Sequence, residues 1–499
     1  MSRRSRPRYR MRLKILCALV GGLLASVSVL APYGFGLRTE QTLTALVQLA
    51  EELWDIPIYT TAYHRGWWNA TAETWLVLPP GTLETWRHTL PFLPPMTPAS
   101  DHGLTLTHHI LHGPLPFGAR PSGVPSLRPV QTMLSSGLFP GAPGQARLGT
   151  PDAPLPLLQV HTTIGLFGGG QGHFAMPAFV QPPGPPEEAT TVWEGLQGEV
   201  TVDAHGRHIT GTVQAPGLAL MWEDSRLALQ HASAQVEVLT PRRQPARSTL
   251  TIRLGSLALT HRSAASASWA MTTASLQTTA TTAHGLLQAH VTSQAHALRL
   301  GDGSYGPGTA RLDIERLHLV ALRDMLRGLH EASQDEPDMA AFWLRLVLSG
   351  DLAALLAGVV ATSPALTLHE LSLHTVDGDI RVKMQIHVDG SRLFPPGYLS
   401  QVLQTVEAEA AAEAPAAWVR AMVIAQVRRL IRAQSRFAAL LPDSALNALA
   451  ATMSDRQLHN LVEQGYLVLD GTTYKSQARY TQGQLLVQGK PVDLPIPGP

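Results

Sequence analysis

Cysteine is almost absent from this sequence: Cys17 is the only one in 499 residues. A chain with a single cysteine makes no internal disulfide, and a chain of this length does not need one to fold. Cys17 also lies inside an apolar segment near the N-terminus. The long remainder therefore has no cysteine for a zinc or iron–sulfur site and no thiol nucleophile.

Charge is scarce as well. Charged residues make up 15% of the sequence, whereas about a quarter is typical. The net charge is +1, but seven basic residues fall within the first 14 positions, and subtracting them leaves −6 for the rest. These seven are Arg3, Arg4, Arg6, Arg8, Arg10, Arg12 and Lys14. Because nucleic-acid-binding proteins carry an excess of positive charge, this balance argues against nucleic acid as a partner.

Residues 15–37, ILCALVGGLLASVSVLAPYGFGL, contain no formal charge. About 20 apolar residues are enough to cross a bilayer as a helix, and basic residues before such a stretch favour a cytoplasmic N-terminus. The sequence therefore predicts a basic cytoplasmic tail over residues 1–14 and a single-pass transmembrane anchor over residues 15–37. The alternative is a cleaved signal peptide, which Pro32 disfavours because it follows the best small-residue site at Ala31.

Alternation of apolar and polar residues dominates the next part of the chain. It predicts a β-rich part over residues 38–188, with strands at 68–78 and 104–112. Residues 118–188 form an insertion rich in proline and glycine, where proline confines strands to edges or strand ends. From residue 189 to 318, short alternating runs separated by turns such as GDGSYGPG predict an antiparallel meander.

The last part, residues 319–499, combines helices with hairpins. Apolar residues at helical spacing predict helical segments over residues 319–332, 338–361 and 397–434, the last a helix pair broken near Pro415. The same spacing predicts an earlier helix over residues 39–54. Asp443 caps a further helix to Thr452, and Ser454 with Gln457 forms a capping-box pattern for another.

Two hairpins complete the expected fold. Leu368 to Thr375 pairs with Ile380 to Val388, and TTYKSQARY pairs with LLVQGKPVDL at the C-terminal end. The sequence thus predicts an α+β, β-dominated fold. It consists of an N-terminal transmembrane helix followed by an extended, mostly antiparallel sheet with several packed helices.

Three short motifs occur in order along the chain. They are Tyr63-His64-Arg65-Gly66 at the entry to a strand, His112-Gly113-Pro114 at a turn, and Tyr480-x-x-Gly483 followed by Gly489. With the N-terminal apolar segment, their order and spacing resemble the YdgA-like family of bacterial envelope proteins, which carry a domain of unknown function. The resemblance covers nearly the whole chain except the insertion. It implies a protein anchored in the bacterial inner membrane with a β-rich body in the periplasm, and it implies no established reaction.

We expect structural rather than catalytic roles for these motif residues. Gly66 would supply a special backbone angle or a bulge, while Tyr63 and Arg65 hold neighbouring strands together.

Other groupings offer little chemistry. The densest histidine cluster is His102, His108, His109 and His112. On a strand, His108 and His112 would lie about 13 Å apart, too far to share a metal ion. In HELSLH, His369 and His374 are five residues apart, not the four that place two histidines on one helical face. FGGGQGH at 167–173 lacks the Lys-Ser/Thr pair of a phosphate-binding loop. No metal, cofactor or catalytic residue is predicted.

Two functions remain open at this point. The first is a non-enzymatic envelope protein that binds a lipid or a protein partner, or acts as a scaffold. A basic helical face could take part in this binding; its residues are Arg420, Arg428, Arg429, Arg432 and Arg436. The alternative is a periplasmic hydrolase acting on envelope polymers, which would require a pair of carboxylates facing each other across a cleft or an activated serine.

Overall fold

In the computed structural model the chain forms two compact units, residues 1–239 and 240–499. The described residues are 37, 39–41, 43–45, 47–48, 51, 57–67, 69–77, 103–112, 130–140, 156–165, 168–181, 190–222, 224–242, 244–261, 268–301, 303–334, 351–392, 403–434 and 442–492. The segment boundaries expected at 188 and 318 stay predictions.

The N-terminal unit contains eleven described strands, all paired antiparallel. They are β1 (Ile58–Arg65), β2 (Asn69–Val77), β3 (Gly103–His112), β4 (Val130–Pro140), β5 (Leu158–Gly165), β6 (Gly170–Met176), β7 (Phe179–Gln181), β8 (Thr190–Trp193), β9 (Leu196–Val202), β10 (His208–Met221) and β11 (Ser225–Leu239). Strands β1 to β6 pair in sequence order, β6 pairs with β9, and β9 pairs with β10, which pairs with β11. The short β7 pairs with β8, which lies along the other half of β10.

The core of this unit lies around β1 to β4. Ala70, Ala72 and Ile110 are almost fully buried on one face of β2 and β3. The described residues of segment 39–54 are helical. This helix meets the sheet through Thr39, whose Oγ1 lies 3.0 Å from Oγ1 of Thr132.

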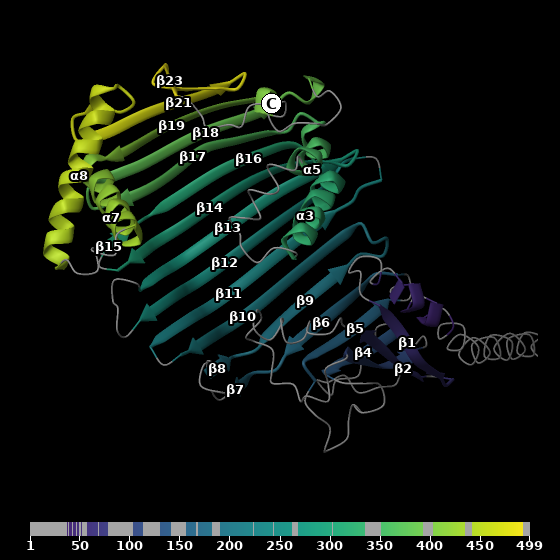
Figure 1. Cartoon of the computed structure of the whole chain (residues 1–499). Helices are drawn as coiled ribbons and strands as arrows, with labels where there is room; N and C mark the ends of the chain where they lie inside the picture. Colours follow the sequence, from purple (N-terminus) through teal and green to yellow (C-terminus); the bar gives the residue numbers. More distant parts are fainter. Residues whose placement is uncertain are drawn as a thin grey trace, which may run out of the picture. The chain divides into compact units, whose positions relative to one another are not determined.

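The C-terminal unit also consists mainly of antiparallel strands (Figure 1). Its strands are β12 (Ala246–His261), β13 (Trp269–Ala283), β14 (Leu286–Leu300), β15 (Gly303–Tyr305), β16 (Gly308–His318), β17 (Ala365–Thr375), β18 (Gly378–Val388), β19 (Val406–Pro415), β20 (Val468–Asp470), β21 (Thr473–Thr481), β22 (Gln484–Val487) and β23 (Lys490–Val492). They pair in the order β12, β13, β14, β16, β17, β18, β19, β21, β22, β23, while β15 adds to β14 and β20 adds to β21.

Helices flank this sheet at the two ends of its strands (Figure 1). They are α3 (Leu319–Gln334), α5 (Asp351–Val360), α7 (Ala416–Gln434) and α8 (Asp443–Glu463), with a short 3-10 turn η3 (Gly390–Arg392). The buried aliphatic side chains described in this unit all lie on helices: Val360, Val427, Leu446, Ala450 and Leu458. The fully buried aliphatic side chains described in the C-terminal unit are therefore helical, whereas the apolar side chains of strand β18 are half-buried.

The expected transmembrane anchor is corrected by the structure. Residues 15–36 lie outside the described residues, and none of the helices that are described is long and apolar enough to cross a bilayer. The described helices are too short or too charged for a span: α5 has only ten residues, while α3, α7 and α8 each carry several charged side chains. The prediction of a single-pass inner-membrane protein with a periplasmic body is therefore not supported.

Two helical predictions also need correction. Residues 406–415, expected in the first helix of a pair, form strand β19, and Pro415 ends that strand immediately before α7. Helix α8 runs unbroken through Ser454, which was expected to cap a new helix. The Ser454 hydroxyl is buried and donates to the carbonyl of Ala450 at 2.7 Å, so it bonds within the helix instead.

Candidate functional site

The sheet of the C-terminal unit has two chemically different faces. Along β18, half-buried and exposed residues alternate without interruption. The half-buried side chains are Ile380, Val382, Met384, Ile386 and Val388, and the exposed ones are Asp379, Arg381, Lys383, Gln385 and His387. Because successive residues of a strand point to opposite faces, β18 defines an apolar face and a polar face for the strands paired with it.

The cross-strand register extends the apolar face over seven strands. One row of opposed residues, the central apolar row, consists of Val291, Leu312, Leu368, Met384, Ala410, Ala478 and Val487. At a spacing of about 4.8 Å between strands, this row is roughly 29 Å long. Every one of its side chains is half-buried, and none is polar.

Among the described residues, parts of the apolar face are exposed. In the adjacent row, Leu371 and Ala412 stand on either side of Val382, and both are exposed, Leu371 by 40%. At the C-terminal end of β18, Val388 packs against Val360 of α5, as does Leu356. Between its edges the face therefore presents apolar surface to solvent.

The polar face holds a cavity of about 920 Å³, here called the polar cavity, whose wall also includes Leu368, Met384, Ala410 and Ala478 of the central apolar row. Its polar side chains come from β17, β18, β19 and β21. The main ones are His369, Lys383, Gln385, Glu409, Gln477 and Arg479. Glu409 and Arg479 form an exposed ion pair with a distance of 3.3 Å from Nε to Oε1.

A β-bulge in β17 shapes this cavity. Leu368 stands opposite Met384 and Leu371 opposite Val382, so His369 and Glu370 together stand opposite the single residue Lys383. A bulge bends its strand and increases the local twist. Here it gives the polar face one more side chain, His369, at the wall of the cavity.

His369 is held in place by a carboxylate that also binds a second histidine. Its Nε2 lies 2.8 Å from Oδ2 of Asp313, while Nδ1 of His290 binds Oδ1 of the same carboxylate. The hydrogen bond from His290, then that from His369, lowers the pKa of the Asp313 carboxyl. Sequence alone does not single out His290 or Asp313, because only the register of β14, β16 and β17 brings them together.

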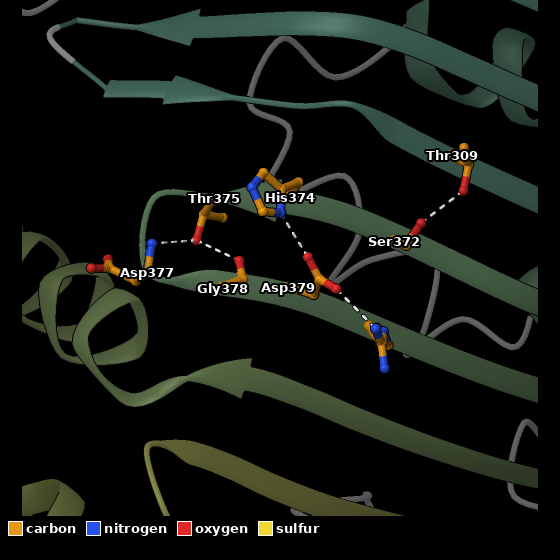
Figure 2. Close-up of polar contacts among 8 residues, drawn as sticks. Thr309, Ser372, His374, Thr375, Asp377, Gly378 and Asp379 are labelled. Carbon is orange, nitrogen blue, oxygen red and sulfur yellow. Dashed lines mark hydrogen bonds and ion pairs between the residues drawn. The ribbon is translucent and has the colours of Figure 1, made fainter.

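A second polar cluster surrounds the turn between β17 and β18 (Figure 2). His374 Nδ1 and Arg381 Nη2 each lie 2.8 Å from a different oxygen of Asp379, and both hydrogen bonds lower the pKa of that carboxyl, His374 the more. The Thr375 hydroxyl donates to the carbonyl of Gly378 at 2.7 Å and accepts from the N–H of Asp377 at 3.2 Å. These contacts fix the turn and leave little capacity for a ligand.

The motif Tyr63-His64-Arg65-Gly66 ends β1 and enters the turn to β2. Gly66 donates its N–H to the carbonyl of Asn69 at 2.8 Å and closes that turn. Arg65 Nη1 lies 3.1 Å from Oε2 of Glu40, while His64 is exposed. Burial, and next the Glu40 carboxylate, raise the pKa of Tyr63.

His112 of the second motif meets the first motif in space. It is fully buried, and neither of its ring nitrogens makes a hydrogen bond of good geometry. Burial lowers its pKa; the Gly66 backbone opposes this in part and the Arg65 charge adds to it. Gly113 and Pro114 lie outside the described residues. The residues of the first two motifs thus gather at one end of β1 to β3, where Arg65 also lines a cavity of about 520 Å³ together with Glu40 and Thr44.

The third motif follows β21. Tyr480 belongs to that strand, and its hydroxyl is buried without a hydrogen-bond partner, which fits its raised pKa. Gly483 and Gly489 lie in two-residue turns, with φ of 81° and 77°. Each follows a glutamine that also has a positive φ. This is the backbone conformation of a type I′ hairpin turn, which favours glycine.

The histidines and glycines singled out in the sequence do not come together at one site. His108 is buried between Thr74 and Ser136, its ring nitrogens 3.3 Å and 2.8 Å from their hydroxyls, whereas His109 is exposed on the other face of β3. His369 and His374 bind different carboxylates. In the glycine-rich stretch, Gly168 and Gly169 make the turn between β5 and β6.

Some arginines on the basic face of α7 form hydrogen bonds with side chains of α8 in the same unit. Arg420 forms a bidentate pair with Asp455 of α8, at 2.5 and 2.8 Å, and Arg428 contacts Asn447. Arg436 lies outside the described residues. Over the part of the chain that the structure describes, no group of three or more histidine, cysteine or acidic side chains is placed to hold a metal ion.

Comparison with known proteins identifies the family but not an activity. No curated protein and no solved structure matches this chain. Residues 12–495, almost the whole sequence, match the family of bacterial proteins of unknown function DUF945. This chain therefore belongs to the DUF945 family.

Proposed function

We propose that this protein is a non-catalytic binding protein whose C-terminal unit holds a lipid acyl chain on the apolar face of its sheet. The observation that carries the proposal is the central apolar row, seven strands wide and free of polar side chains. Burying apolar surface is favourable by about 25 cal/mol per Å². An uncovered face of this kind therefore gains stability when an apolar ligand covers it.

The small side chains in the middle of the apolar face favour an acyl chain over a protein as the ligand. Ala408, Ala410 and Ala412 project from β19, with Ala478 next to Ala410 on β21, so the middle of the face is shallow and smooth. Protein interfaces carry about one hydrogen bond per 100–200 Å² and anchor large side chains in pockets. A strip without hydrogen-bonding groups and with small side chains suits a ligand that is uniformly apolar along its length.

The experiment compares two neighbouring alanines of β19. Ala410→Glu places a charge in the central apolar row, and Ala411→Glu places the same charge one residue away on the polar face. We expect Ala410→Glu to weaken binding of a fluorescent polyunsaturated fatty acid at least tenfold and Ala411→Glu to leave it unchanged. Ala412→Glu, at an exposed site of the apolar face, provides a second variant if Ala410→Glu does not fold.

Equal affinity in all variants, or no binding by the native protein, would contradict the proposal. A stable complex with a protein, dependent on Ala410 but insensitive to fatty acid, would also overturn the choice of ligand.

The hydrolase alternative gains no supporting observation. In the described cross-strand pairs, no carboxylate stands opposite another carboxylate: Asp313, Asp379 and Glu409 are each bound by a basic side chain. A closer relationship to the YdgA-like proteins within the DUF945 family is also a proposal, supported by the order of the three motifs along the chain.

A further inference from the structure

The polar cavity contains a cation without a partner. Among the described residues, Lys383 has no ion pair or hydrogen bond from its ammonium group. Its neighbours across the strands are Ala411 and the bulge at His369 and Glu370. Glu370 stands opposite Arg311 of β16, and His369 is bound to Asp313. None of these groups neutralises Lys383.

The cavity is weighted toward positive charge. Of its described lining residues, only Glu409 is acidic, and its carboxylate is already paired with Arg479. With Lys383 added, the lining carries two cations and one anion. An acidic ligand therefore meets an attractive site whose local charge it would balance.

Hydrogen-bond donors surround the free ammonium. Gln385 lies two residues after Lys383 on β18, so both side chains are on the same face. Lys383 is paired with Ala411 of β19, which is paired in turn with Gln477 of β21. Ala411 has a small side chain, which leaves space between Lys383 and Gln477. Ammonium and amide N–H groups donate to oxygen, and a phosphate group offers several acceptor oxygens.

We infer that the polar cavity binds the phosphomonoester of a small hydroxyl-bearing ligand. The Lys383 ammonium holds the phosphate, and Gln385 and Gln477 donate to the remaining oxygens. The cavity of about 920 Å³ lies within the 300–1,000 Å³ range of small-molecule sites. A free phosphorylated polyol and the exposed headgroup of a lipid share this chemistry. The inference does not rest on the acyl-chain proposal, because it concerns the opposite face.

The test uses the full chain and measures binding of glycerol 3-phosphate by calorimetry, with glycerol as the neutral comparison. In a second arm, co-sedimentation with vesicles containing phosphatidic acid reports the lipid source. Lys383→Met should weaken binding tenfold or more, the size expected for one charge-assisted hydrogen bond. Lys383→Arg should retain most of it.

Two variants separate a site from a general charge effect. Arg253→Met removes a cation from the same face on β12, outside the cavity lining, and should leave binding unchanged. Ala411→Glu puts a carboxylate beside Lys383 and should abolish binding, while Ala412→Glu, outside the cavity lining, should not. Binding of either phosphate source that depends on Lys383 supports the inference. Binding of neither source, an equal effect of Arg253→Met, or binding of glycerol as tight as its phosphate would overturn it.

Discussion

Single residues with unusual backbone angles set the ends of many strands in this protein. His284-Gly285, Gln482-Gly483 and Gln488-Gly489 each form a two-residue turn in which both φ angles are positive. A non-glycine residue in this region costs about 1–2 kcal/mol, and glycine avoids that cost at the second position of each turn. These turns fix the register of the strands on both sides.

Replacing one of these glycines tests whether glycine stabilises these turns by adopting a positive φ angle. Nothing lies within 4 Å of a Cβ added at Gly489, so Gly489→Ala introduces conformational strain without a clash. We expect the variant to lower the free energy of unfolding by about 1 kcal/mol, measured by chemical denaturation. Gly489→Asn should be milder, because asparagine tolerates positive φ. Equal effects of alanine and asparagine would point to another cause.

A buried histidine should make the stability of the N-terminal unit depend on pH. Burial lowers the pKa of His108 to about 4, from an ordinary value of 6.5. Between these two values the unfolded chain binds a proton that the folded chain does not, so the free energy of unfolding falls as the pH falls. A pKa difference of this size corresponds to about 3 kcal/mol in total.

Substitution of neighbouring histidines isolates that effect. Stability is measured by denaturation at pH values from 4 to 7. His108→Gln should flatten the slope, since glutamine can still bond Thr74 and Ser136 but does not titrate. His109→Gln, at an exposed position of the same strand, should preserve the slope. An unchanged slope in His108→Gln would show that other groups carry the dependence.

At the scale of elements, strand β19 shows where local sequence misleads. Residues 406–415 are rich in alanine and glutamate, which favour helix, yet they pair with β18 and β21. The signal for a strand is present, because Glu407, Glu409 and Glu413 all occupy one face of a period-two pattern. Pairing with two neighbouring strands decides the outcome, and a single sequence does not reveal those partners.

The hairpin of β17 and β18 could be predicted because its local sequence signals agree with its pairing. Its alternation is regular and its turn, Val376-Asp377, is short, so periodicity and turn chemistry agree. The bulge at His369 and Glu370 was not predictable, since it depends on the register with β16 and β18. The polar cavity beside the bulge therefore stayed hidden in the sequence.

Substitutions in helix α8 test which of its faces belongs to the buried core. Leu446 is 1% exposed and begins a buried stripe with Ala450, Ser454 and Leu458, while Leu449 is 44% exposed. Leu446→Ala should lower the free energy of unfolding by about 2–5 kcal/mol, and Leu449→Ala by much less. Denaturation monitored by far-ultraviolet circular dichroism compares the two variants. Similar losses at both positions would contradict the assignment of this stripe to the core.

On the scale of the whole molecule, the sequence predicted strands well and their partners poorly. The motifs around Tyr63 and His112 could be read as a strand entry and a turn, and their meeting in space followed only from the pairing of β1, β2 and β3. The expected membrane anchor depended on hydropathy and on the basic residues before the apolar segment, and it was not supported among the described helices. Apolar and polar residues alternate along many strands of the sequence, and this pattern indicated a sheet with one apolar and one polar face.

The sheet of the C-terminal unit has one apolar and one polar face. In a globular domain the apolar face of a sheet is normally buried by a second layer. In the C-terminal unit the described aliphatic core lies on the helices, so the apolar face keeps its capacity for a ligand.

Photolabelling tests this claim most directly. A fatty acid carrying a diazirine on its acyl chain is bound to the full chain, irradiated, and mapped by mass spectrometry of peptides. We expect labels on apolar-face residues of β17, β18, β19 and β21, above all at Met384 and Ala410, with excess unlabelled fatty acid suppressing them. Labels confined to the polar face or to the N-terminal unit, or labelling that excess fatty acid does not suppress, would contradict the account.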